Sequence, residues 1–168
     1  FEDSNMKRTI ATRTIISAFG FVAMLAAGTA AADEYRVTAF GNAKAYTALI
    51  SQDVGKAEME FSKAELAGLD FAEANNLCVT KILSKELPVA VAACEAALSK
   101  LTSEVYISAM SEKAAKASIY SNLAVAEALS GNLSAASGYL EMSLSFNADD
   151  ANALANYDLI ATSLIAQN

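Results

Sequence analysis

Two cysteines are the residues of this chain whose type and spacing most directly permit chemistry. Cys78 and Cys94 fall on the facing stripes of one expected helix pair, on either side of a tight turn. In an oxidising compartment they can form a disulfide, and closing a loop of this length stabilises a fold by roughly 3 kcal/mol. The alternative is two buried free thiols that fill space as small apolar side chains. A catalytic dithiol is not expected, because it needs C-x-x-C spacing and an electropositive setting.

The other polar residues form no recognisable catalytic set. The chain has no histidine, which is the commonest general base and transition-metal ligand. The pairs Glu58/Glu60 and Asp149/Asp150 are better explained by a solvated face and a helix cap, because neighbours on a helix do not face each other. Residues 150–161 begin like a calcium loop but lack its central Gly and final Glu. We therefore expect no metal, no cofactor and no enzymatic activity.

Composition points to helices and limits the classes of partner. The chain has 168 residues with a net charge of −7, one proline and no tryptophan. Its richness in Ala, Leu, Glu and Lys is typical of helical proteins. An acidic chain cannot displace the counterions of a nucleic-acid backbone, and it is repelled by an anionic membrane surface. Neither is an expected partner.

Residues 6–32 resemble a bacterial Sec-type signal peptide. A basic start is followed by an apolar region over residues 15–27 and an A-x-A site ending at Ala32. Cleavage after Ala32 predicts a periplasmic or secreted protein with no stable membrane span, and no cysteine follows that would carry a lipid anchor. Residues 1–5 have no assigned role. The alternative is a buried or anchoring N-terminal helix.

Helical periodicity dominates from residue 43 onward. Residues 33–42 are expected to form a poorly ordered lead-in, with a short extended segment as the alternative. Apolar spacing then predicts helices up to about residue 52 and over residues 54–66, 71–85, 117–130, 133–146 and 151–166, with another beginning at Pro88. Residues 100–116 contain no Pro or Gly, so we expect longer helices with a break near Ser103 or Ser111.

One pattern occurs twice, over residues 75–98 and 121–144. The two copies align in phase at Asn76/Asn122, Leu77/Leu123, Leu83/Leu129, Leu87/Leu133, Ala90/Ala136 and Leu98/Leu144. Each copy contains two amphipathic helices separated by a short break. Because neither helix pair can bury its apolar stripe alone, the copies must stack, with Leu77 and Leu123 in one shared core.

This pattern resembles the tetratricopeptide repeat, a helix-turn-helix unit of 34 residues. The second copy matches the family motif at Tyr120, Leu123, Ala124, Gly131, Asn132, Ala136 and Leu140. The first copy matches it at Leu77, Cys78, Ala90 and Ala97, with Lys85-Glu86 in place of the glycine turn. The resemblance implies an all-α fold, namely a right-handed α-α superhelix with repeats at about 43–70, 71–104 and 117–150 and a cap at 151–166. The alternative is an unrelated antiparallel helical bundle.

The resemblance also implies a groove that binds a peptide or a partner helix. The groove-facing candidates come from the first helix of each copy: Asn75, Val79, Ile82, Ser121, Val125 and Ala128. Because they are apolar with a polar fringe, we expect an apolar extended or helical segment rather than an acidic tail. Alternatively, these residues pack on neighbouring helices. Asn76 and Asn122 could form structural hydrogen bonds or contact a partner.

The sequence thus favours a protein–protein interaction scaffold of the periplasm or cell envelope. Two alternatives remain open. One is a small helical enzyme or ligand-binding domain, which requires a closed pocket with converging polar groups. The other is a structural subunit that self-associates weakly through an uncapped end of its helical stack.

Overall fold

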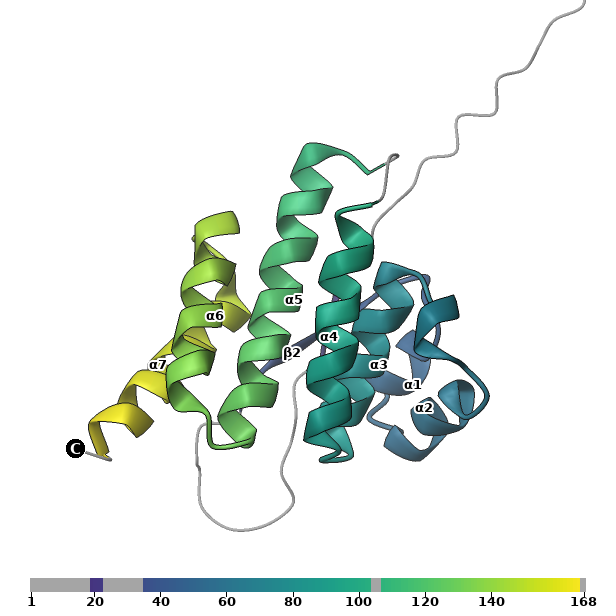
Figure 1. Ribbon diagram of the computed structural model, residues 1–168, viewed down its shortest axis with the longest axis horizontal. Coiled ribbons are helices and arrows are strands. Elements are labelled where there is room, and N and C mark those ends of the chain that lie inside the picture. The colour runs from purple at the N-terminus through teal and green to yellow at the C-terminus, as the bar shows by residue number, and fades with distance from the viewer. Residues whose placement is uncertain (1–18, 23–34, 104–106, 167–168) are drawn as a thin grey trace, which may run out of the picture.

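The computed structural model describes residues 19–22, 35–103 and 107–166. The predicted all-α class is confirmed, since helices make up most of the described chain (Figure 1). The elements in order are β1 (Phe19–Val22), β2 (Val37–Phe40), α1 (Tyr46–Ile50), α2 (Val54–Phe61), a 3-10 turn (Leu66–Gly68), α3 (Phe71–Leu83), α4 (Leu87–Leu101), α5 (Ala109–Leu129), α6 (Leu133–Phe146) and α7 (Ala151–Ala166).

Five helices form two adjoining layers. Helices α3, α5 and α7 lie side by side in one layer, and α4 and α6 pack against them in the other. Helix α3 forms a hairpin with α4, and α5 forms a hairpin with α6. Figure 1 shows α1 and α2 at one end of this arrangement, α7 at the opposite end, and β2 behind α4 and α5.

Local sequence signals explain where these helices begin. Asp70 and Glu73 form a capping box at the start of α3, so each side chain binds a free backbone N–H of the first turn. Pro88 occupies the first turn of α4, where its missing N–H is harmless. Ser108 caps α5 by accepting a hydrogen bond from the backbone N–H of Ser111. Helix α4 ends at Leu101 and α5 begins at Ala109, so Ser103 lies between the two helices, as one of the two expected breaks requires, whereas Ser111 lies inside α5.

The two hairpin turns have the same backbone shape despite different sequences. Lys85 and Gly131 follow the ends of α3 and α5, and both have positive φ, 63° and 87° respectively. In each turn this residue and the next donate to carbonyls of the preceding helix, which is a common helix C-terminal motif. Lys85-Glu86 thus replaces Gly131-Asn132 without changing the turn.

The first helices of the two sequence copies share one interior. Leu77 and Leu123 belong to the same hydrophobic cluster, together with Leu49, Ile82 and Val125. This confirms the prediction of a shared core. A second cluster, which includes Ala124, Leu140 and Ile160, lies between α5, α6 and α7.

The prediction of a poorly ordered lead-in over residues 33–42 is wrong for β2. Val37, Thr38, Ala39 and Phe40 are all buried, and the Phe40 ring packs edge-on against Phe71 with centroids 6.0 Å apart. An isolated four-residue strand would not be stable in water. It persists because distant helices satisfy its backbone, as described below.

Strand β1 pairs with β2 in antiparallel orientation, with Val22 opposite Val37 and Gly20 opposite Ala39. Residues 19–22 therefore have strand backbone, and not the backbone of the N-terminal helix that was the alternative to a signal peptide. The rest of the predicted signal peptide, its cleavage position and residues 1–5 lie outside the described residues. Across the described ranges, no helix has both the length and the apolar character needed to span a bilayer.

Candidate functional site

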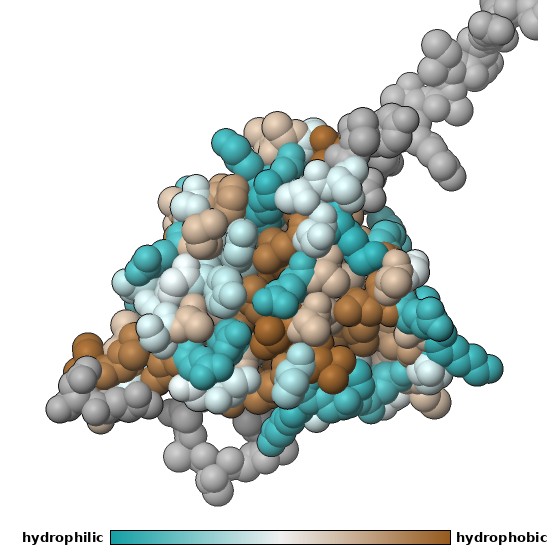
Figure 2. Space-filling model, viewed as in Figure 1, coloured by the Kyte–Doolittle hydropathy of each residue, from teal (hydrophilic) through white to brown (hydrophobic). Residues whose placement is uncertain are grey.

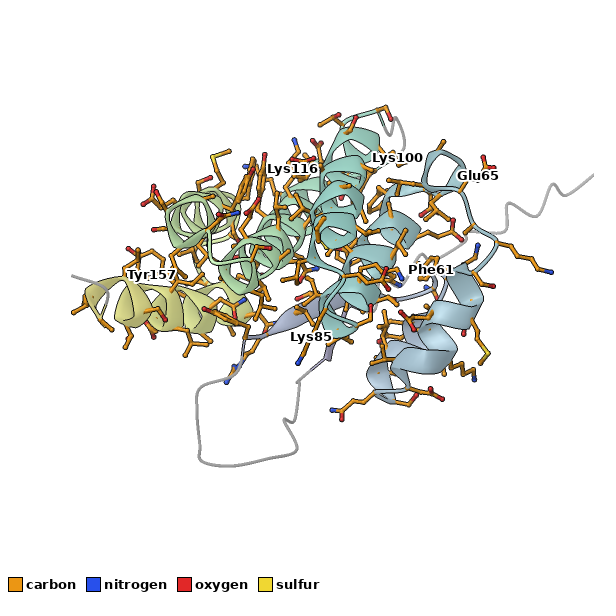
Figure 3. All side chains as sticks on the ribbon, turned by 60° about the horizontal axis from the view of Figure 1, so that its bottom comes forward. Phe61, Glu65, Lys85, Lys100, Lys116 and Tyr157 are labelled. Carbon is orange, nitrogen blue, oxygen red and sulfur yellow. A yellow bond between two sulfur atoms is a disulfide. The ribbon has the colours of Figure 1, made fainter. Side chains whose placement is uncertain are left out.

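Three asparagines, one on each helix of the β2-facing layer, bind the backbone of β2 and of the preceding residue, Arg36. Asn76 lies on α3, Asn122 on α5 and Asn156 on α7. Figure 3 shows β2 lying across these helices, on the side opposite α4 and α6. We refer to Asn76, Asn122 and Asn156 as the asparagine ladder.

Each ladder amide binds both backbone polar groups of one residue. Asn76 accepts from Phe40 N at 2.7 Å and donates to Phe40 O at 2.9 Å. Asn122 accepts from Thr38 N and donates to Thr38 O, both at 2.8 Å. Asn156 accepts from Arg36 N at 2.7 Å and donates to Arg36 O at 2.8 Å. The ladder therefore engages every second residue, as the period of an extended strand requires.

Further polar side chains complete this buried network. Asn75 donates to Thr38 O and accepts from the Asn122 amide, both at 2.9 Å. Asn152 donates to Thr38 Oγ1 at 2.9 Å, and Asn156 also donates to the hydroxyl of Ser121 at 3.1 Å. No buried side-chain N or O atom of the described chain lacks a partner. A fully satisfied network of this kind fixes one arrangement of its groups.

The chemistry of this site is uncharged backbone recognition. A side-chain amide offers one acceptor and two donors, so it can match the N–H and C=O of a peptide unit without any charge. Because backbone groups are the same in every residue except proline, the ladder selects an extended conformation rather than a sequence. At the start of the strand, burial raises the pKa of the Tyr35 phenol above its ordinary value.

All six predicted groove residues lie within this region, but they are buried. Asn75 binds β2 directly, while Val79, Ile82 and Val125 belong to the same hydrophobic cluster as Val37 and Phe40. Ser121 binds Asn156, and Ala128 packs in the second cluster. The surface that the sequence assigned to a partner is therefore covered by a segment of the chain itself. Similarly, Asn76 and Asn122 bind the chain's own backbone.

Cys78 and Cys94 form a disulfide between α3 and α4. Their Cα atoms are 5.2 Å apart, and both residues are fully buried. The bridge joins the two helices of the first hairpin. This position is structural, because no solvent-exposed sulfur is available for exchange.

The paired carboxylates take structural positions. Glu60 accepts from Ala45 N at 2.8 Å, and Asp150 accepts from the N–H groups of Asn152 and Ala153 at the start of α7. Lys81 forms ion pairs with Glu58 at 3.4 Å and Glu86 at 2.5 Å, which link α2 to the α3–α4 turn. The hydrogen bond from Lys81 lowers the pKa of Glu86, and the same bond raises the pKa of Lys81.

An open depression of about 520 Å³ lies where the start of α5 meets the end of α6. It is lined by Ala109, Met110, Lys113, Ala114, Phe146 and Asn147. Nearby, the Tyr120 ring stacks on Phe146 with centroids 5.8 Å apart, and the Lys116 ammonium lies 5.5 Å from the Phe146 centroid. Among the described residues, no group of three or more Cys, Asp or Glu side chains could hold a metal ion.

Sequence reasoning missed Asn156 and Asn152, although one signal was present. Asn156 follows Asn122 by 34 residues, which is one repeat length, while Asn122 follows Asn76 by 46. The same helix position thus recurs in α7, which the sequence had assigned only a capping role. The target of this third amide, Arg36, could not be inferred from spacing.

The asparagine ladder therefore combines one side chain from each of α3, α5 and α7 at a single extended segment. Comparison of the chain with protein-family models, with curated proteins and with solved structures finds no match.

Proposed function

We propose that this protein is a non-enzymatic protein–protein interaction scaffold of the bacterial periplasm or cell envelope, built from tetratricopeptide-like helical hairpins. The observation that carries the proposal is the asparagine ladder, which binds an extended backbone from three alternate helices, α3, α5 and α7. Because β2 occupies the ladder, what a partner would meet is a rigidly held strand, which is suited to pairing with an extended polypeptide.

The helix arrangement supports the repeat assignment. Helices α3 and α5 begin two hairpins with the same turn geometry. Helix α7 packs beside α5 and would be the first helix of a third hairpin. Two features support export: the signal-like residues 6–32 and the Cys78–Cys94 disulfide, which is compatible with an oxidising compartment.

Site-directed photocrosslinking in bacterial envelopes tests this function. A photoreactive residue is placed at Arg36 or Asn42, which are exposed on either side of β2, and at Glu95 or Glu141 on the second-layer helices as controls. We expect discrete protein adducts from the first pair and none of the same mass from the second. The absence of any adduct specific to the positions beside β2 would contradict the proposal.

Self-association is a second candidate, and it is favoured by the outer face of α7. Leu154, Tyr157 and Ile165 have exposed fractions of 44%, 39% and 77%. Figure 2 shows apolar residues at this end of the molecule, and Figure 3 labels Tyr157 on α7. In α5 the position equivalent to Tyr157 is Leu123, which is buried because α5 has a following hairpin helix and α7 has none in the described chain.

Light scattering over a concentration series distinguishes this candidate. If α7 mediates self-association, the apparent mass should rise with concentration and the double variant Leu154→Ser, Tyr157→Ser should remain monomeric. The variant Val89→Ser, Met110→Ser removes exposed apolar side chains elsewhere and should behave like the parent chain. A concentration-independent monomeric mass for the parent chain would exclude this role.

A further inference from the structure

We propose that the outer edge of β2 is the partner-binding site, and that it accepts an apolar extended strand of another protein in antiparallel orientation. The incoming strand takes the place that β1 occupies in this structure. This inference rests on the proposed scaffold function and specifies where and how the scaffold binds.

The inner edge of β2 is fully used by the ladder. The N–H and C=O groups of Arg36, Thr38 and Phe40 are bound to asparagine amides. In a strand, consecutive residues direct these groups to opposite edges. The N–H and C=O groups of Val37 and Ala39 therefore point to the outer edge, away from the helices.

The outer edge accepts a strand in the observed register. Val37 lies opposite Val22, and Ala39 lies opposite Gly20. Because Val37 and Ala39 direct their polar groups outward, the pairs Val22–Val37 and Gly20–Ala39 are the hydrogen-bonded pairs between the antiparallel strands. Phe21 lies opposite Thr38 in a pair that is not hydrogen-bonded.

Loss of β1 would leave this edge open. Strand β1 lies inside the predicted signal peptide, and cleavage after Ala32 would separate it from β2. The backbone groups of Val37 and Ala39 would then lack protein partners on a strand held rigidly from its other side. A fixed, unpaired strand edge is a template for strand addition.

The proposed occupant is an uncharged apolar strand of about four residues, which is the length over which β1 pairs with β2. The segment that occupies the edge here reads Phe-Gly-Phe-Val, and β2 itself reads Val-Thr-Ala-Phe, so neither strand carries a charge. Recognition comes mainly from the main chain, so the preference is for conformation and apolar character rather than for one sequence.

Peptide binding to the full chain tests this inference. The probe is a fluorescent peptide of residues 17–24 with terminal lysines for solubility. In the variant Gly20→Pro, β1 loses a backbone N–H that pairs with β2, so the outer edge of β2 should open. Gly20→Ala keeps that N–H and is the matched control. We expect the peptide to bind Gly20→Pro at least about tenfold more tightly than Gly20→Ala.

N-methylated peptides then identify the edge. Methylation at the positions of Gly20 or Val22 removes an N–H directed at β2 and should weaken binding at least about tenfold, whereas methylation at Phe21 should leave it unchanged. Equal affinities for peptides methylated at Gly20, Phe21 and Val22 would overturn the edge assignment. Photocrosslinked adducts at Arg36 and Asn42 would still support a scaffold independently. Failure of Gly20→Pro to bind the peptide, or its conversion to a dimer that excludes the peptide, would also overturn the inference.

Discussion

At the level of single residues, this fold depends on amide side chains in its interior. Asn76, Asn122 and Asn156 are almost completely buried, where an unpaired amide would be costly. Each amide instead replaces the strand neighbour that β2 lacks on its inner edge. Because the amides do not titrate, this interaction is insensitive to pH.

Replacing the central ladder residue should destabilise the protein strongly. In Asn122→Ala, Thr38 N and Asn75 Oδ1 lose the partners described above. Buried unsatisfied groups cost about 1–3 kcal/mol each, so we expect the free energy of unfolding to fall by about 2–4 kcal/mol. Urea denaturation measures this change.

The matched control is Asn132→Ala. Asn132 is exposed and its side chain donates an exposed hydrogen bond to Glu127, so the loss should stay within about 0.5 kcal/mol. Equal effects of the two substitutions would show that the ladder does not stabilise β2.

At the level of secondary-structure elements, the two hairpins are held in different ways. The α3–α4 hairpin has a disulfide and a strained turn residue, Lys85, which has positive φ. The α5–α6 hairpin has no disulfide but has Gly131, which adopts positive φ without a steric cost. It also has a buried hydrogen bond from Ser143 Oγ to Ala117 O at 2.7 Å.

Substitutions at the two turn residues, Lys85 and Gly131, should change the free energy of unfolding in opposite directions. Lys85→Gly relieves a left-handed conformation and should raise the free energy of unfolding by up to about 1 kcal/mol. Gly131→Ala introduces that strain and should lower it by about 1 kcal/mol, although the added Cβ meets no atom within 4 Å. Thermal denaturation of both variants compares them, and shifts of the same sign would contradict the backbone explanation.

Removing the disulfide should weaken the first hairpin. Sixteen positions separate Cys78 from Cys94, and in the chain-entropy model a cross-link of this span stabilises the fold by about 3 kcal/mol. We expect the Cys78→Ala, Cys94→Ala variant to lose about that amount in urea denaturation. Reducing agent should lower the stability of the parent chain but leave the variant unchanged. A parent chain insensitive to reduction would refute a stabilising bridge.

At the level of the whole molecule, the N-terminal strand joins elements that are distant in sequence. Through the ladder, β2 contacts α3, α5 and α7, so residues separated by 36, 84 and 120 positions meet at one strand. The strand is thus part of the core rather than an appended tail.

Hydrogen exchange should show this integration directly. The amides of Thr38 and Phe40 are buried and bound to the ladder, so they should exchange only when the whole domain unfolds. The amide of Gly68, in an exposed 3-10 turn, should exchange much faster through local opening. Exchange monitored by NMR across a denaturant series measures both, and fast exchange at Thr38 would mean that β2 detaches from the folded helices.

The amino-acid sequence by itself determined the helices and their turns. Apolar periodicity, Pro88, the break at Gly131 and the cap at Asp150 act within a few residues, so they can be interpreted without knowing the fold. The in-phase copies also predicted that Leu77 and Leu123 share a core, and the spacing of Cys78 and Cys94 permitted the disulfide.

Only the tertiary structure decided what fills the groove. Residues 37–40 lack a strong strand pattern, and their conformation is stable only because three helices bring amides to their backbone groups. Such long-range pairing leaves no periodic trace in the segment itself, since the partners that satisfy it lie far along the chain. The same segment that looked like a loose lead-in is for this reason a buried strand, with one edge bound to the ladder and the other facing β1.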